Sequence, residues 1–316
     1  MKKIVIIGEI LVEIMADTTG LGFAEPQPLT GPYPSGAPAI FADQAARLGQ
    51  PVGLVSAVGD DDFGRLNTDR LARDGVDVSG VHVDHDRPTG SAFVRYSDDG
   101  ARDFVFNIRH SACGALHMTS AVRSLLDSAD HLHVMGSSLS DPDFVALNLD
   151  TARAVRARGG SVSFDPNLRK EILSAPGLAD AMAEMLALTD LYLPSGDELT
   201  LLTQAKAPQE AVAELLQRGI SAIVHKNGAT GATYHDADVT HTARAYSVDE
   251  IDPTGAGDCF GATFTALWLR AIDPRHALDL AMASGALAVT KRGPMEGTAD
   301  LATLETFVRT SERIPS

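Results

Sequence analysis

Short apolar runs alternate along this chain with longer stretches in which apolar residues recur at helical spacing. The strand-like runs are residues 4–7, 52–58, 161–164, 191–193 and 222–224. The helix-like stretches are residues 39–48, 63–74, 141–157, 208–218, 257–271 and 275–291. Parallel strands need a long crossover connection, which is usually a helix, so this alternation predicts a doubly wound α/β fold. We expect a mostly parallel sheet that is flanked by helices.

Two segments interrupt this alternation. One, at about residues 10–34, is rich in Gly and Pro. The other, at about residues 88–107, alternates around an Asp98-Asp99-Gly100 turn, which is typical of a β-hairpin. Because two excursions that leave the same sheet can pair, we expect a small β lid over its edge. With 316 residues, of which 44% are hydrophobic, the chain is expected to form one domain, residues 1–316, that includes this lid.

Acidic residues outnumber basic ones by 42 to 26, which gives a formal net charge of −16. Such a surface repels nucleic acids and anionic lipids, so we expect neither as a partner. The first apolar run is too short for a signal peptide, and no stretch approaches the length of a membrane span, which favours a cytoplasmic protein. Cys113 and Cys259 match no metal-ligand spacing and are interpreted as small core residues. The charge also raises a question, because an acidic protein should disfavour anionic substrates.

The most informative motif lies at residues 252–260 and begins Asp-Pro-Thr-Gly-Ala-Gly-Asp. Pro253 and Gly255 indicate a loop, and an amphipathic helix follows it. Gly255 and Gly257 allow an anion to approach backbone N–H groups at the N-terminus of this helix, where the helix dipole favours negative charge. Asp258, in the first turn, has two interpretations. It stabilises the helix dipole, or it takes a proton from an attacking hydroxyl while the amides hold a phosphoryl group in transfer. The Gly-Ala-Gly run favours the second interpretation.

This motif resembles the signature of the ribokinase-like (PfkB) carbohydrate kinases. Further segments that are similar to motifs of this family occur in the family's order, namely Gly8-Glu9-Ile10-Leu11, Ser35-Gly36-Ala37-Pro38-Ala39, the stretch at residues 58–64, Thr89-Gly90, Asp165-Pro166-Asn167-Leu168-Arg169 and Lys226-Asn227-Gly228-Ala229. The resemblance covers nearly the whole chain. It is most similar to the branch of 2-keto-3-deoxygluconate kinases, fructokinases and tagatose kinases, with tagatose kinases the nearest match.

The resemblance implies an ATP-dependent kinase that phosphorylates a primary hydroxyl of a free sugar with Mg²⁺. Asp258 would be the catalytic base, and Gly255, Ala256 and Gly257 would form the anion hole. The residues that would contact ATP are Lys226, Asn227, Gly228, Gly255, Gly257 and Ser195. Two ordinary alternatives stay open at this point: Lys226 as a solvated lysine at a strand end, and Gly228 as a turn glycine.

The resemblance also implies cation sites. Glu198 would order Mg²⁺ through water, in a segment similar to the family's Asn-x-x-Glu in which Ser195 replaces the Asn. Asp252 and Thr254 match positions that surround a monovalent cation, such as K⁺, in some members of the family. The alternative for Asp252 is that it braces the loop.

The sugar, by the same resemblance, would be contacted by Glu13, Gly36, Ala37, Arg169 and Asp258. Ile40 stands where many members have a sugar-contacting Asn, and an apolar side chain cannot supply that hydrogen bond. The pattern of hydroxyls that is recognised should therefore differ. Asp43 and Gln44 follow one helical turn later, with a surface position as the alternative to a sugar contact.

Kinases of this branch that act on sugar acids carry an Arg three residues before a Ser-Ala pair. Here Ile108 has that position and Arg109 follows it. In a strand, an offset of one residue turns the side chain to the other face. This favours a neutral ketohexose, tagatose or fructose, over the alternative substrate 2-keto-3-deoxygluconate.

Two other function classes are weighed against the kinase. A sugar- or nucleotide-binding relative without catalysis is favoured by Ile40 and Ser195, but it would not need Asp258. A nicotinamide-dependent dehydrogenase would need Gly-x-Gly-x-x-Gly after the first strand, where this chain has Gly8-Glu9-Ile10-Leu11. Finally, the exposed edge of a short β lid invites pairing, so the lid is expected to be a homodimer surface.

Overall fold

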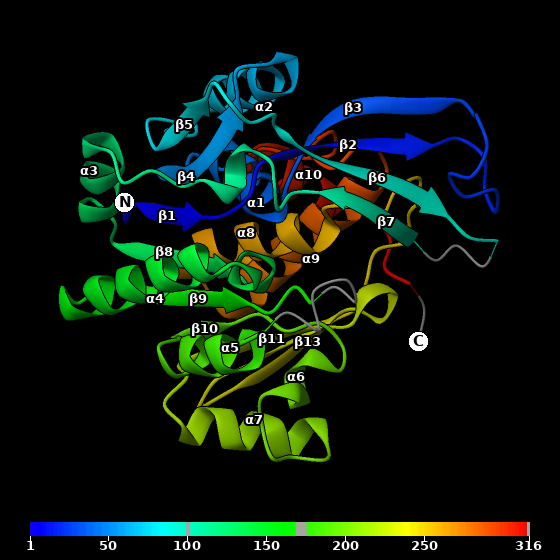
Figure 1. The fold of residues 1–316 in the computed structure, drawn as a ribbon. Coiled ribbons are helices and arrows are strands. Elements are labelled where there is room, and N and C mark those ends of the chain that lie inside the picture. Colours follow the sequence, from blue (N-terminus) through cyan, green and yellow to red (C-terminus); the bar gives the residue numbers. More distant parts are fainter. Residues whose placement is uncertain (99–101, 169–175, 315–316) are drawn as a thin grey trace.

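The computed structural model describes residues 1–98, 102–168 and 176–314, and its main feature is a large twisted sheet (Figure 1). The spatial order of the strands is β13-β12-β11-β10-β9-β8-β1-β4-β5. The bounds of the strands are β1 Ile4–Ile7, β4 Val52–Gly59, β5 Val81–Asp84, β8 His131–Met135, β9 Ser161–Asp165, β10 Leu191–Tyr192, β11 Ala222–Lys226, β12 Ala232–His235 and β13 Thr240–Ala243. Neighbouring strands from β5 to β11 are parallel, and β12 and β13 add an antiparallel edge.

Helices cover both faces of this sheet. Their bounds are α1 Ala37–Arg47, α2 Asp62–Asp74, α3 Ser120–Asp127, α4 Pro142–Ala157, α5 Leu178–Ala187, α6 Glu198–Leu201, α7 Pro208–Gln217, α8 Ala256–Leu269, α9 Pro274–Val289 and α10 Leu301–Thr310, with short 3₁₀ turns η1 Ala112–Gly114, η2 Gly136–Ser140 and η3 Gly228–Thr230. On one face, apolar residues of α3, α4, α5 and α7 form a buried cluster with β1, β8 and β9. On the other face, α1, α8 and α9 pack against the alternate residues of the strands. The doubly wound α/β class is therefore confirmed.

The two segments that interrupt the alternation form a second sheet, which we call the small sheet. It contains β2 (Leu11–Ala16), β3 (Leu29–Ser35), β6 (Gly90–Tyr96) and β7 (Arg102–Asn107), in the order β3-β2-β6-β7. β2 and β6 are parallel, and the two outer pairings are antiparallel. Figure 1 shows the small sheet beyond the arrowheads of β1 and β8, at the carboxyl ends of the parallel strands. That edge of an open α/β sheet is where ligands usually bind.

Gly36 makes the sharp connection from the small sheet to α1. Its φ is 108°, a conformation that residues with a side chain rarely adopt. A Cβ at this position would lie 2.5 Å from the carbonyl oxygen of Glu9, which follows β1. The glycine thus brings the N-terminus of α1 against the end of the first strand.

Two polar residues for which a surface position was one alternative lie in the interior. Asp43 and Gln44, on α1, have no exposed surface, so a surface position for them is wrong. Gln44 exchanges hydrogen bonds with the backbone of Ala299, and Asp43 accepts one from Thr298. Cys113 and Cys259 are free thiols in the core. In the part of the chain that the structure describes, no helix combines the length and apolar character that a membrane crossing requires.

Candidate active site

The loop at residues 252–255 ends at the N-terminus of α8. Gly255 is the N-cap, with φ 81°, and a Cβ there would lie 2.5 Å from the carbonyl oxygen of Pro294. Only glycine fits this turn without displacing backbone. Ile40, which is 2% exposed, approaches the same glycine from α1, 3.3 Å from the Cβ position. Ile40 therefore packs beneath the loop, which explains why an apolar residue is suitable there.

Asp258 lies in the first turn of α8 and is 4% exposed. Its Oδ1 accepts a hydrogen bond of 2.9 Å from the side-chain amide of Asn167. Asn167 follows β9 and has a φ of 39°, a left-handed conformation that Asn tolerates better than most residues. This amide orients one carboxylate oxygen of Asp258. Asn167 is part of the Asp-Pro-Asn-Leu-Arg segment, but the sequence alone does not indicate this role for it.

Lys226, at the end of β11, forms an ion pair with Asp165 at the end of β9. Both side chains are buried, so the alternative of a solvated lysine is wrong. The ammonium group also lies close to the start of α8, because a Cβ at Gly257 would be 3.8 Å from Nζ. A positive charge and the amino end of a helix dipole thus meet at one place, which favours an anion.

A cavity of 400 Å³ opens beside this place. Lys226, Gly228, Ala256 and Gly257 line one end of it. The remainder of the wall, for which no sequence motif provides a signal, is mainly apolar and includes Ala245, Tyr246, Val248, Phe260, Met282, Ala286 and Val289. Asn227 and Ser195 are not among its lining residues, although Asn227 directly precedes Gly228. A pocket that is apolar in one part and cationic at one end suits a molecule with a flat ring and an anionic tail.

Glu198 lies at the start of α6 and holds two loop ends together. Its Oε1 accepts a hydrogen bond of 2.8 Å from the backbone N–H of Leu168, and its Oε2 accepts one of 2.7 Å from that of Ser195. Burial raises the pKa of Glu198 above its ordinary value, and the nearby carboxylate of Asp165 raises it further. A cation near both carboxylates would counter this effect by stabilising the ionised forms.

The residues predicted to contact a sugar lie where the small sheet meets α1. Glu13 of β2 is 4% exposed, and its Oε1 accepts a hydrogen bond of 3.1 Å from the hydroxyl of Ser35. Ser35 immediately precedes Gly36 and Ala37, so these four positions are brought together. Arg169, the remaining predicted contact apart from Asp258, lies outside the described residues.

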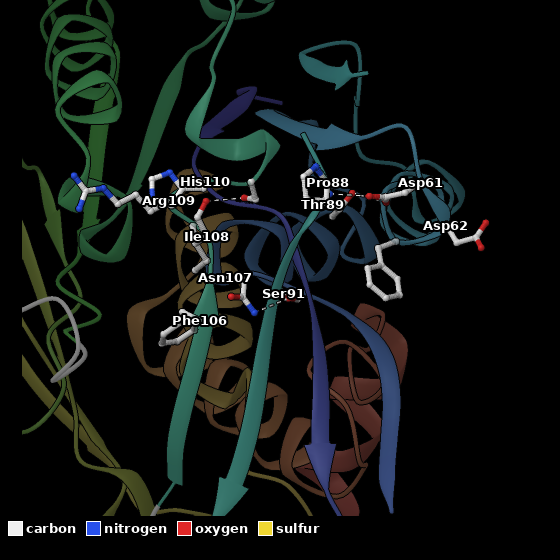
Figure 2. Close-up of a pocket in the computed structure, with 12 residues that line it drawn as sticks. Asp61, Asp62, Pro88, Thr89, Ser91, Phe106, Asn107, Ile108, Arg109 and His110 are labelled. Carbon is white, nitrogen blue, oxygen red and sulfur yellow. Dashed lines mark hydrogen bonds between the residues drawn. The ribbon is translucent and has the colours of Figure 1, made fainter. Parts of the chain in front are cut away.

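A second cavity, of 680 Å³, lies at the base of the small sheet (Figure 2). It is bounded by the start of α2 at Asp61, by Thr89 before β6 and by the residues that follow β7. In Figure 2 the side chain of Arg109 extends away from Asp61 and Thr89. Among the described residues, none of the predicted sugar, nucleotide or metal contacts lines this cavity.

Asp252 and Thr254 brace the loop before α8. Asp252 is 1% exposed, and its Oδ1 accepts hydrogen bonds from the backbone N–H and the hydroxyl of Thr254, at 3.0 and 2.7 Å. Its Oδ2 accepts one of 3.0 Å from the backbone N–H of Gly293. These contacts are the ones expected if Asp252 braces the loop.

Comparison with known proteins identifies the family of this chain. A family model described as "pfkB family carbohydrate kinase" matches residues 1–300. The chain belongs to this family. PfkB carbohydrate kinases are phosphotransferases that act on a sugar hydroxyl, and this activity class agrees with the kinase expected from the motifs.

Curated relatives of this PfkB chain include kinases for different sugars. A 2-dehydro-3-deoxygluconokinase of Thermoproteus tenax is 33% identical over 309 residues, covering 94% of this chain and 91% of the relative. A probable fructokinase-7 of Arabidopsis thaliana is 32% identical and a fructokinase of Escherichia coli 31% identical, covering 92% and 93% of this chain and 88% and 95% of the relatives. The named substrates of these relatives differ at similar identity.

Solved structures agree with the PfkB assignment over nearly the whole chain. An E. coli protein provisionally named ribokinase II, in complex with ATP and Mg²⁺, is 48% identical with a TM-score of 0.92, covering 98% of this chain and 99% of that one. A double mutant of a fructokinase of Vibrio cholerae O395, with fructose, ADP and a potassium ion bound, is 28% identical with a TM-score of 0.83, covering 98% of each chain.

Proposed function

We propose that this PfkB kinase transfers the γ-phosphoryl group of ATP to a primary hydroxyl of a free sugar, and that its preferred substrate is a neutral ketohexose such as tagatose or fructose. The observation that carries the proposal is the position of Asp258. Its buried carboxylate is oriented by Asn167 and stands in the first turn of a helix that begins with Gly255-Ala256-Gly257.

In this proposal Asp258 accepts the proton of the sugar hydroxyl as the hydroxyl oxygen attacks phosphorus. Backbone N–H groups of Ala256 and Gly257 stabilise the negative charge on the phosphoryl oxygens in transfer. Lys226 adds a positive charge at the same end of the 400 Å³ cavity, whose apolar part would hold the adenine. Glu13, Gly36 and Ala37 would contact the sugar beneath the small sheet, which would act as a lid that excludes water.

The described residues contain no cluster of three or more His, Cys, Asp or Glu that could hold a metal ion. This fits Mg²⁺ as an ion that is held mainly by nucleotide phosphates and water, which is its usual mode in kinases. Glu198, together with Asp165, would accept hydrogen bonds from water bound to the ion. The ion, when bound, would neutralise charge on the phosphates.

The preference for a neutral ketohexose is supported by the side chains around the sugar position. Ile40 is buried beneath Gly255 and presents no hydrogen-bonding group. β7 ends at Asn107, so Ile108 and Arg109 lie after the strand and the expectation that a strand offset turns Arg109 to the other face is wrong. The similarity to the T. tenax enzyme favours 2-keto-3-deoxygluconate as the second candidate. A coupled assay of ADP production across free ketoses, aldoses and sugar acids tests both: the highest kcat/KM is expected for a ketohexose, and a clear preference for a sugar acid would reverse the order.

The role of Asp258 is tested by the variant Asp258→Asn. Because the amide has nearly the shape of the carboxylate but cannot accept the proton, we expect normal folding, retained ATP binding and a fall in kcat of about 10²–10⁴-fold. Circular dichroism and calorimetric titration with ATP are the controls for folding and binding. Turnover close to that of the unaltered chain would exclude Asp258 as the base. No sugar-dependent ADP production by the unaltered chain across the panel would favour the non-catalytic relative.

A further inference from the structure

Two side chains of the small sheet reach the loop that precedes α8. The hydroxyl of Tyr96, the last residue of β6, donates a hydrogen bond of 3.3 Å to Oδ1 of Asp252. Nη1 of Arg102, the first residue of β7, donates one of 2.8 Å to the hydroxyl oxygen of Thr254. These contacts span 156 and 152 residues of sequence. The sheet that carries Glu13 is thereby connected to the loop that carries the anion hole.

Further contacts hold the small sheet at the same place. Arg292, which follows α9, forms an ion pair of 3.1 Å with Asp17, which follows β2. Tyr33 of β3 packs against Gly293, where a Cβ would lie 2.6 Å from its ring. Gly293 is itself a donor to Asp252. These contacts hold the small sheet, which carries Arg102, against the segment that contains Gly293 and against Asp252.

Arg102, Thr254 and Asp252 form a continuous chain of hydrogen bonds. The guanidinium donates to the hydroxyl of Thr254, and that hydroxyl donates to Oδ1 of Asp252 at 2.7 Å. Arginine keeps its charge at all ordinary pH values, so this chain joins a permanent cation to a buried carboxylate. The same electrostatic environment is visible at Tyr96, whose pKa is raised above its ordinary value by burial and by the charge of Asp252, while Arg102 opposes this increase.

The environment of Asp252 and Thr254 does not favour a bound monovalent cation. Both carboxylate oxygens of Asp252 already accept hydrogen bonds, from Thr254, Tyr96 and Gly293. The guanidinium of Arg102, in contact with Thr254, would repel a second cation placed between the same two residues. The carboxylate already has a positive charge nearby, so a metal cation is not needed to balance it.

We propose that Arg102 is a positioning residue that supplies, from the small sheet, the positive charge that holds the Asp252–Thr254 loop, so that the reaction does not depend on a monovalent cation. Arg102 touches no reacting atom. It acts through Thr254, whose successor Gly255 caps α8 and sets the direction of the anion-hole amides. Packing of the small sheet over a bound sugar would then order the anion hole at the same time.

The test compares the unaltered chain with Arg102→Ala in buffers that contain either K⁺ or only tetramethylammonium as the monovalent cation. The unaltered chain should have the same kcat in both. The variant should lose about 10- to 100-fold in kcat without K⁺, less than the loss expected for a direct anion-hole donor. K⁺ or guanidinium ions should restore part of this loss in the variant only.

A second readout does not need the sugar or the reaction. The melting temperature of Arg102→Ala should rise on addition of K⁺ or guanidinium at constant ionic strength, because a cation can then occupy the place of the side chain. The melting temperature of the unaltered chain should not respond. The kinetic readout rests on the proposed function, whereas the melting temperature does not. A failure of the inference about Arg102 can therefore be distinguished from a failure of the proposed function.

Arg95→Ala is the matched control. Arg95 is on β6, the neighbouring strand of the small sheet, and it forms a partly exposed ion pair of 3.3 Å with Asp103, so its removal should change neither readout. Arg102→Lys should keep most of the activity in the absence of K⁺, since it retains the charge. The inference is wrong if the unaltered chain is strongly activated by K⁺, or if Arg102→Ala resembles Arg95→Ala in both readouts.

Discussion

The pKa of the buried residue Asp43 depends on partners that are distant in the sequence. Burial raises its pKa from 3.8 to about 6, while Arg70 and a hydrogen bond from Thr298 oppose the increase. A carboxyl group with a higher pKa in the folded state binds its proton more tightly there than in the unfolded chain. Its contribution to stability is therefore present below about pH 4 and is lost as the pH rises through about 6.

We expect Asp43→Asn to remove this part of the pH dependence. The difference between the two pKa values corresponds to about 3 kcal/mol, so the free energy of unfolding of the variant should fall less between pH 4 and pH 7. Urea denaturation at a series of pH values measures the slope. Asp62→Asn is the control, because that side chain is 94% exposed. Equal slopes for Asp43→Asn and the unaltered chain would contradict the prediction.

At the level of single residues, the sequence led to most of the groups that the structure brings together. Asp258, Gly255 and Gly257 were found because one short motif contains them. Two contacts between residues that are distant in the sequence could not be found in this way. Asn167 contacts Asp258 across 91 residues, and Lys226 contacts Asp165 across 61, and no local pattern indicates either pairing.

At the level of elements, the connection between β3 and α1 depends on Gly36. Gly36→Ala would strain a φ of 108° and would also place Cβ 2.5 Å from a backbone oxygen. We expect it to lower the free energy of unfolding by about 2–4 kcal/mol and to reduce kcat/KM for the sugar, because the start of α1 must move. Urea denaturation and the coupled assay measure the two effects.

Gly49 is a matched control for this element. Its φ is 70°, also left-handed, but a Cβ there would have no atom within 4 Å. Gly49→Ala should therefore cost only the conformational strain, about 1 kcal/mol, and leave kcat/KM unchanged. If the two variants were equally stable, the close approach to Glu9 would not be important.

There is a physical reason why an element such as β8 could not be predicted from the sequence. β8 contains His131 and His133, which interrupt its apolar run, yet both are fully buried. Both ring nitrogens of His131 and Nδ1 of His133 form hydrogen bonds of 2.6–2.7 Å with the hydroxyls of Ser161 and Ser163 on β9, which helps to accommodate the two rings. Burial lowers the pKa of both histidines, to about 3 for His131, so they remain neutral. A polar pair on a neighbouring strand cannot be recognised from the pattern of one strand.

At the level of the whole molecule, association through the small sheet stays a prediction. β3 and β7 are its edge strands, and exposed apolar side chains lie on both, at Leu29 (44% exposed) and Val105 (50% exposed). We expect a dimer, with twice the chain mass of 33.3 kDa, in light scattering coupled to size-exclusion chromatography.

Val105→Asp should shift this dimer to the monomer, because it places a charge in the expected interface. Val239→Asp changes an exposed valine between β12 and β13, away from the small sheet, and should leave the mass unchanged. A monomeric mass for the unaltered chain would refute association through the small sheet.

The net charge of −16 takes a different meaning at this scale. A charge of this sign disfavours anionic substrates in general, but the nucleotide proposal needs only a local positive field. Lys226, which pairs with Asp165, and the N-terminus of α8 lie beside the 400 Å³ cavity. In the proposal, these two groups and Mg²⁺ together would provide that field.

The sequence by itself determined the fold class, part of the order of the elements and the loop with Asp258 at the start of α8. These features depend on periodicity, glycine and proline positions and helix ends, which act over a few residues. The tertiary structure alone decided that Asn167 orients Asp258, that Lys226 pairs with Asp165 and that Arg102 reaches Thr254. Such contacts depend on which distant segments are buried together, because a charge or hydrogen bond in the interior is stable only when its partner is brought to it by the whole fold.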